Sequence, residues 1–178
     1  MDYKSQNAAY EEKVITRPGS WNILSFINIG TWTPKEEFRE RYPTAFKIID
    51  YFGDAIYSAA YIVMEPQMII RRHSDSANKE ATWIRVHIPL IVPEGDLGLE
   101  CQGEQRHWDE IFAFNAQKAH SAWNFTDKRR LVIVVDLLRS ACDLPPVEAW
   151  YPGCNDGIPR FEKTERESAE WKKRYKGN

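Results

Sequence analysis

Two histidines and one carboxylate stand in an order that suits an iron centre. His73-Ser74-Asp75 forms a His-x-Asp motif, His120 follows later in the chain, and Arg130 lies ten residues beyond it. Two imidazoles and one carboxylate hold non-haem Fe(II) on one face and leave its other face open. An arginine one strand further on suits the distal carboxylate of a dicarboxylate cosubstrate. These residues suggest an oxygenase that uses Fe(II), a 2-oxo acid with a second carboxylate, and O2.

Each of these residues also has an ordinary structural interpretation. A His-x-Asp motif arises by chance in many chains. His120 could be a hydrogen-bonded histidine of the core, and Arg130 could be the partner of Asp127 or Asp136. Taken singly, the structural interpretations are favoured, so the surrounding elements must decide.

The pattern of short apolar segments predicts a β-rich fold. Segments separated by Gly, Pro and Asp turns indicate a sandwich or jelly roll rather than alternating βαβ units. The expected strands cover residues 55–64, 67–72, 82–92, 97–101, 112–114 and 130–138. Helical patterns precede them at residues 34–41 and 44–52, and a charged surface helix is expected at 161–176.

The expected strand from Trp83 to Leu90 has two chemically different faces. Alternation of side chains places Trp83, Arg85 and His87 on one face and Ile84, Val86, Ile88 and Leu90 on the other. A face with a cation and an imidazole is expected to line a pocket, which makes His87 a rival candidate for metal binding. His107 lies in a polar stretch and is expected at the surface.

The strand expected at 130–138 is apolar on both faces except for Arg130 and Asp136. A strand of this kind is buried on both sides. We therefore expect Arg130 at the mouth of a pocket.

Length and composition indicate one soluble globular domain. The chain has 178 residues, of which 43% are hydrophobic and 28% charged, and its net charge is -2. We expect a core at about residues 55–140, an N-terminal arm with helices at 1–54 and a C-terminal extension at 141–178. The near balance of charge gives no reason to expect nucleic acid or an acidic membrane surface as a partner.

The cysteines and the apolar segments favour a reducing compartment. Cys101, Cys142 and Cys154 lie far apart and form no Cys-x-x-Cys pair, so neither a zinc site nor a disulfide framework is predicted. Residues 1–13 lack the apolar core of a signal peptide. The longest apolar stretch, 55–64, is too short to span a bilayer. A cytoplasmic location is expected.

An ordered series of motifs between Tyr61 and Leu138 resembles the aspartyl/asparaginyl β-hydroxylase family of Fe(II)/2-oxoglutarate oxygenases. The similar elements are, in order, Met64-Glu65-Pro66, His73, Arg85-x-His87, Pro89-Leu90, Val92-Pro93, Trp108, Ile111-Phe112-Ala113-Phe114-Asn115, His120-Ser121-Ala122-Trp123-Asn124, Arg130 and Val134-Val135-Asp136. Tyr42-Pro43-Thr44 and the helix after it are similar as well, though less distinctive.

The resemblance implies a double-stranded β-helix, a jelly roll of the cupin kind, with flanking helices. It implies iron on His73 and His120 and 2-oxoglutarate held by Arg130. Arg85 and His87 match family positions that also contact the cosubstrate, which makes His87 less suitable as a metal ligand.

Three positions depart from the family pattern. Asp75 is present, as in small bacterial amino-acid hydroxylases with a full triad, whereas members that act on epidermal-growth-factor-like domains lack this carboxylate. Phe114-Asn115-Ala116 stands where Phe-Asp-Asp is usual, so the support of that loop is expected to differ. Ile62 replaces a cosubstrate-binding serine of some relatives, so the carboxylate anchor is expected to depend more on Arg130.

We therefore predict a 2-oxoglutarate-dependent hydroxylase that acts on an amino acid, an amino-acid residue in a peptide or a close derivative. Arg71, Arg72 or Arg129 could hold a substrate carboxylate, or all three could be solvated surface residues. A small-molecule or peptide substrate is expected. Two alternatives stay open: a cupin-like binding protein without turnover, and an oxidative halogenase, which Asp75 disfavours because halide needs the carboxylate position. Isomerisation on zinc or manganese would not need Arg130.

Overall fold

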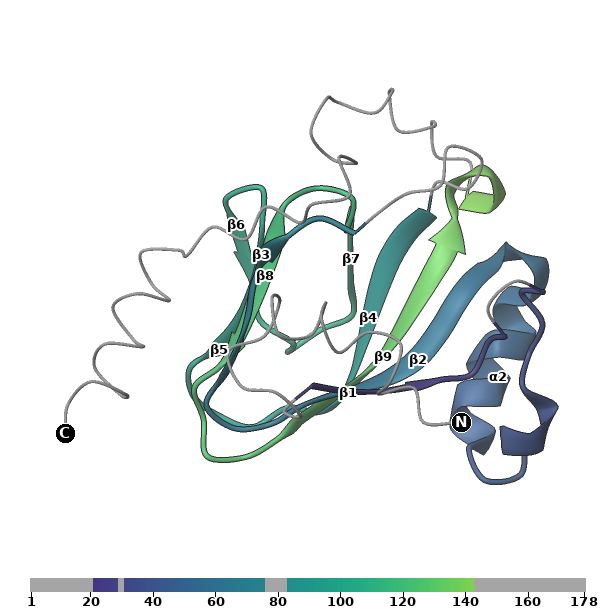
Figure 1. Cartoon of the computed structure of the whole chain (residues 1–178), viewed down its shortest axis with the longest axis horizontal. Coiled ribbons are helices and arrows are strands. Elements are labelled where there is room, and N and C mark those ends of the chain that lie inside the picture. Colours follow the sequence, from purple (N-terminus) through teal and green to yellow (C-terminus); the bar gives the residue numbers. More distant parts are fainter. Residues whose placement is uncertain (1–20, 29–30, 76–82, 143–178) are drawn as a thin grey trace, which may run out of the picture.

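The computed structural model describes residues 21–28, 31–75 and 83–142 of the chain. Residues 1–20 of the expected N-terminal arm and the expected helix at 161–176 lie outside the described residues. In the part that is described, two antiparallel sheets face each other, with one helix on the outer side of the larger sheet (Figure 1).

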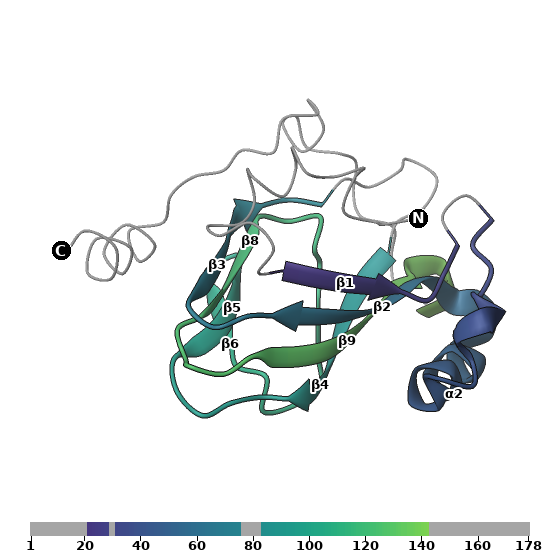
Figure 2. The same ribbon diagram turned by 60° about the horizontal axis from the view of Figure 1, so that its bottom comes forward.

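The larger sheet has five strands and the smaller has four. The larger sheet has the order β1 (Trp21–Ser25), β2 (Ile56–Met64), β9 (Arg130–Leu138), β4 (Trp83–Ile91) and β7 (Phe112–Phe114). The smaller sheet has the order β3 (Met68–His73), β8 (His120–Asn124), β5 (Leu97–Cys101) and β6 (Glu104–Arg106). Figure 2 shows β1, β2 and β9 running side by side, and Figure 1 shows β4 next to β9.

The chain alternates between the two sheets. It passes from β2 in the larger sheet to β3 in the smaller, returns at β4, crosses again at β5 and β6, and continues in this way through β7 and β8 to β9. Winding of two facing antiparallel sheets by one chain is the double-stranded β-helix, so the predicted fold class is confirmed.

One core fills the space between the sheets. Alternate side chains of each strand point inward, as β-strand geometry requires. The buried apolar members of this inner core are Met64, Met68, Ile70, Leu97, Leu99, Cys101, Trp108, Phe112, Ala122, Val132 and Val134. The polar side chains of the candidate site lie on the same inward faces.

A second core lies between the larger sheet and the helix α2 (Pro43–Phe52). Pro43 stands at the helix start, where its fixed φ is compatible with helix and its missing N–H costs nothing. Ala45, Phe46 and Ile49 form the buried stripe of the helix and pack on the outward side chains of β2 and β9. Gly53 ends the helix with φ of 51°.

The segment expected to be helical at 34–41 contains only a short 3-10 helix, η2 (Glu36–Phe38). The difference has a local cause, because Pro34 forms a β-bridge with Ile27 and the chain is therefore extended where a helix would begin. A further 3-10 helix, η3 (Gly53–Ala55), links α2 to β2, and η4 (Arg139–Cys142) follows β9.

Three strands were not predicted: β1, β6 and β8. Strand β8 lacks apolar–polar alternation because all five of its residues are buried, including His120, Ser121 and Asn124. Strand β6 is exposed along its length and pairs only with β5.

Close packing of β8 against β5 depends on Gly98. Gly98 is the register partner of Trp123, and a Cβ at this glycine would lie 2.5 Å from the indole ring. The indole covers Gly98 on the outer face of the smaller sheet, and its Nε1–H donates to Asp96 over 2.8 Å.

The described residues contain no helix long and apolar enough to cross a lipid bilayer.

Candidate metal centre

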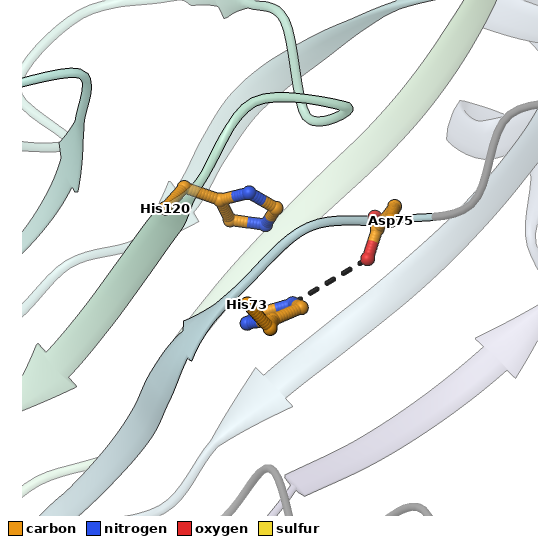
Figure 3. Close-up of side chains that lie close together, drawn as sticks. All are labelled: His73, Asp75 and His120. Atoms are coloured by element: carbon orange, nitrogen blue, oxygen red, sulfur yellow. Dashed lines mark ion pairs between the residues drawn. The ribbon is translucent and has the colours of Figure 1, made fainter. Parts of the chain in front are cut away.

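The three side chains of the predicted triad lie together at one end of the space between the sheets. His73 ends β3, His120 begins β8, and the two are register partners with ring centroids 4.3 Å apart. Asp75 follows two residues after His73, and its backbone N–H donates to the carbonyl of Ala116 over 2.9 Å. One ligand atom from each of the three side chains lies within 4.8 Å of the other two (Figure 3).

A β-bulge turns His73 toward the other two side chains. Ile70 points into the inner core, so strict alternation along β3 would direct His73 to the outer face. The β3–β8 register shifts between Ile70 and His73, and an extra residue in one strand reverses the alternation beyond it. His73 is consequently buried, with 4% of its surface exposed.

Both imidazoles are held in the tautomer that a metal ligand needs. Nδ1 of His73 lies 2.7 Å from the carbonyl oxygen of Arg71, and Nδ1 of His120 lies 2.9 Å from that of Lys118. A carbonyl only accepts, so Nδ1 carries the proton and donates. The lone pair of each Nε2 is then free for a metal.

The surroundings of His120 keep it neutral. Its burial, followed by the positive charge of His73 when that ring is protonated, lowers the pKa of His120 to about 3. A neutral imidazole is the form that binds metal.

The carboxylate of Asp75 is divided between two partners. Its Oδ1 lies 3.4 Å from Nε2 of His73, and its Oδ2 lies 2.5 Å from Nη1 of Arg85. Burial by itself raises the pKa of Asp75, but the positive charge of Arg85 and the contact with His73 outweigh it and hold the pKa well below its usual range. Asp75 is therefore ionised.

Arg85 also binds Asp136, which sequence reasoning had considered as a partner of Arg130. Nε and Nη2 of Arg85 donate to the two carboxylate oxygens of Asp136 over 2.8 and 2.9 Å. Ser58 Oγ donates to the same carboxylate over 2.7 Å. The role of Asp136 could have been found from the sequence, because Asp136 shares the inward face of its strand with Arg130.

His87 lies on the inward face of β4, as its position in the strand predicted, but it does not belong to the group of His73, Asp75 and His120 that could hold a metal. Nδ1 of His87 accepts the indole N–H of Trp108 over 2.9 Å, so its own proton is on Nε2. Burial, together with the positive charges of Arg130 and Arg85, lowers the pKa of His87 well below its usual value. His87 is thus a neutral ring with one N–H to donate.

Arg130 is a buried cation, with 2% of its surface exposed. Its guanidinium lies 4.3 Å from the centre of the Trp108 ring, and its Nε has no hydrogen-bond partner. No carboxylate of the described residues pairs with it, and burial lowers the pKa of Arg130 to about 9. Because burying an unpaired charge is costly, such a cation is expected where an anionic ligand binds.

Ring contacts join the triad to Arg130. Phe114 lies 5.3 Å from His120 and 5.2 Å from His87, measured between ring centroids. His87 stacks on Trp108 at 6.1 Å, and Trp108 lies under Arg130. A continuous series of ring contacts therefore connects the triad to the buried cation.

The loop before His120 is supported by the residues that depart from the Phe-Asp-Asp pattern. Asn115 Oδ1 accepts the backbone N–H of Gln117 over 3.1 Å, and the Asn115 carbonyl accepts that of Lys118 over 2.9 Å. This turn places the Lys118 carbonyl against His120. Ala116, fully buried, offers its carbonyl to Asp75.

The remaining candidates lie in other surroundings. His107 is exposed, as predicted. Arg72 lies 3.4 Å from Glu100, and Arg129, with a largely exposed side chain, lies 3.4 Å from Glu65. Arg71 contributes its backbone carbonyl to His73. Ile62 packs against the inner core.

In sequence, the chain is similar to hydroxylases. The profile of the family described as aspartyl/asparaginyl beta-hydroxylase matches residues 1–140. An ornithine lipid ester-linked acyl 2-hydroxylase of Rhizobium tropici is 26% identical over an alignment of 138 residues, and the match covers 75% of this chain and 47% of that protein. An aspartyl/asparaginyl beta-hydroxylase of Mus musculus is 27% identical over an alignment of 79 residues, and the match covers 43% of this chain and 10% of that protein.

The chain thus spans about half the length, or less, of these curated relatives. Among solved structures, the cupin domain of a transcriptional regulator from Enterobacter cloacae is similar, with a TM-score of 0.40 and 16% identity. The match covers 66% of this chain and 96% of that one.

Proposed function

The chain belongs to the aspartyl/asparaginyl beta-hydroxylase family, and from this premise we propose that it is a hydroxylase dependent on Fe(II) and 2-oxoglutarate. The observation that carries the proposal is the convergence of His73, Asp75 and His120, with both Nε2 lone pairs free and the carboxylate ionised. Two imidazoles and one carboxylate are the donor set of non-haem Fe(II) oxygenases.

In the proposed site, Nε2 of His73, Nε2 of His120 and Oδ1 of Asp75 hold the metal. When bound, Fe(II) with 2-oxoglutarate and O2 supplies the hydroxylation of a C–H bond, with decarboxylation of 2-oxoglutarate to succinate. The backbone carbonyls of Arg71 and Lys118 hold a proton on Nδ1 of each imidazole and orient the rings so that Nε2 faces the proposed site.

Arg130 and His87 are proposed to bind the cosubstrate. A buried guanidinium without a carboxylate partner in the described part of the chain suits the distal carboxylate of 2-oxoglutarate. The N–H on Nε2 of His87 can donate to the same ligand, because Trp108 holds the proton off Nδ1. The apolar rings of Phe112, Phe114 and Trp108 pack around His87, and such apolar surroundings would strengthen these polar contacts.

The names of the two curated relatives suggest a common type of acceptor carbon. The 2-position of an ester-linked acyl group is bonded to the ester carbonyl carbon, and the β-carbon of aspartate or asparagine is bonded to the side-chain carbonyl carbon. We extend this to the present chain. Its acceptor is proposed to be a carbon next to a carboxylate, amide or ester carbonyl, in an amino acid, a peptide residue or a derivative such as an amino-acid-containing lipid.

A turnover assay tests the proposal. The protein is incubated with Fe(II), 2-oxoglutarate and ¹⁸O2 with three kinds of candidate: free amino acids, Asp- or Asn-containing peptides, and ester-linked acyl lipids. Formation of succinate and insertion of one ¹⁸O atom next to a carbonyl are expected with at least one candidate. Insertion at a remote carbon would overturn the substrate class alone, whereas absence of succinate with all candidates would count against the hydroxylase assignment.

A further inference from the structure

Asp75 is the last member of a chain of polar contacts that begins on the larger sheet. Ser58 on β2 donates to Asp136 on β9, Asp136 binds Arg85 on β4 through both carboxylate oxygens, and Arg85 reaches Asp75. Ser58 and Asp136 are register partners, as are Arg85 and Asp136, so the three residues lie opposite one another on three adjacent strands. The pairing of these strands therefore fixes the order of the contacts.

We propose that Asp136 is a positioning residue, which acts through Arg85 to present one oxygen of Asp75 to the metal and withhold the other. The proposal rests on the proposed metal-dependent function. Asp136 itself is not a member of the metal-ligating group.

The geometry of Arg85 supports this role. Its Nε and Nη2 are both engaged by Asp136, at 2.8 and 2.9 Å, which orients the plane of the guanidinium. The guanidinium also lies 4.9 Å from the ring centre of Trp83. With its plane set in this way, Nη1 is directed to Oδ2 of Asp75, and Oδ1 is the oxygen that remains on the side of His73.

The charges give a second reason. Two carboxylates share one guanidinium, and all three side chains are largely buried, with 4% of Asp136, 18% of Asp75 and 19% of Arg85 exposed. Removal of the Asp136 charge would leave Arg85 with Asp75 as its only carboxylate partner among the described residues. Arg85 would then compete more strongly with a metal ion for Asp75, so metal affinity would fall although no ligand was changed.

Titration of the metal-free protein with Co(II), followed through its visible ligand-field bands, tests this inference without turnover. Asp136→Asn is expected to weaken Co(II) binding about 10- to 100-fold, the loss commonly seen when a group that supports a metal ligand is removed. The matched control is Asp50→Asn, which breaks an Arg39–Asp50 contact of 2.7 Å on the surface and is expected to leave Co(II) affinity unchanged.

A double-mutant cycle separates positioning from general loss of structure. In an Asp75→Gly background, Asp136→Asn is expected to have no further effect on Co(II) affinity, because the chain of contacts then ends at Arg85. The same loss of affinity in both backgrounds would overturn the proposal, as would unchanged affinity in the single variant.

If Asp136→Asn does not fold, Ser58→Ala keeps every charge and serves in its place. A loss of a few-fold in affinity, seen only when Asp75 is present, supports the proposal, and no loss contradicts it.

His73→Ala reports separately on the metal centre. If that variant binds Co(II) as the parent does, the proposed metal site is wrong, whereas loss in His73→Ala alone rejects only the role of Asp136.

Discussion

Arg85 contacts Oδ2 of Asp75 and leaves Oδ1 of the same carboxylate facing His73. The contact supports the proposed role of Asp75 as a third metal ligand. It keeps the group ionised inside the protein and orients it toward the two imidazoles.

Arg130→Met is expected to stabilise the protein when 2-oxoglutarate is absent. Arg130 is a buried cation with no partner on Nε, and an apolar side chain of similar length removes the cost of desolvating its charge. The free energy of unfolding at pH 7 should rise by about 1–4 kcal/mol. At the same time, 2-oxoglutarate with Mn(II) should no longer raise the melting temperature, as it should in the parent.

Arg129→Met is the control for this change, since its side chain is 64% exposed and next in sequence. It should alter neither stability nor the response to 2-oxoglutarate. A destabilised Arg130→Met protein that still responds to 2-oxoglutarate would refute the assignment of Arg130 as the anion site.

Trp108→Phe is expected to weaken 2-oxoglutarate binding about 2- to 12-fold, the equivalent of one hydrogen bond of 0.5–1.5 kcal/mol. The variant removes the indole N–H that holds the proton of His87 on Nε2. The dissociation constant can be measured by titration calorimetry with Mn(II) present. Trp123→Phe removes an equivalent indole hydrogen bond, to Asp96 on the outer face, and should leave the constant unchanged. Equal effects of the two variants would contradict the role given to Trp108.

Acidification should destabilise the metal-free protein partly through His87. The pKa of His87 is lowered in the folded state, so the unfolded state binds its proton more readily. The stability that neutral His87 contributes is therefore complete above about pH 6.5, the pKa of an unperturbed histidine, and is lost as the pH falls below it.

Urea unfolding between pH 7.5 and 5 measures this loss. His87→Gln, which cannot titrate, should reduce the slope of the unfolding free energy by up to about 1.4 kcal/mol per pH unit. His107→Gln changes an exposed histidine and should reproduce the parent slope. A parent slope that His87→Gln leaves untouched would show that this ring is not buried in its neutral form.

Gly98→Ala should destabilise the smaller sheet that carries both histidines. The added methyl group would lie 2.5 Å from the Trp123 ring, so either the ring or strand β5 must move, at a cost of about 1–3 kcal/mol. Thermal unfolding measures the loss. Trp123→Leu in the same protein relieves the collision and should recover part of the stability, whereas additive losses would argue against this contact as the cause.

The predictable part of the fold consists of the strands that are marked in the sequence itself, by alternation of apolar and polar residues, as in β4, or by a continuous apolar run, as in β9. Strands β5, β7 and β9 have the predicted bounds, and β2, β3 and β4 differ by one residue or so at their ends. The two faces expected for β4 are confirmed. His87 and Arg85 point inward, and Ile84, Val86 and Ile88 pack against the second core, between the larger sheet and α2.

The rest depended on tertiary contacts that local patterns do not contain. Strand β8 was missed because its polar residues are buried, and Asn124 among them is satisfied by the carbonyls of Met64, Glu65 and Lys128. The bulge that turns His73 inward depends on pairing with β8 and has no local sequence signal. Likewise, the partner of Asp136 was decided by strand order, since β4 and β9 are neighbours and place Arg85 opposite it.

Anaerobic addition of Fe(II) and 2-oxoglutarate tests the central claim most directly, through the visible metal-to-ligand charge-transfer band of their chelate. We predict that the parent protein gives this band, that His107→Ala retains it and that His120→Ala loses it, because His120 supplies a ligand and His107 lies at the surface. Absence of the band from the parent, or its persistence in His120→Ala, would contradict the proposed iron centre.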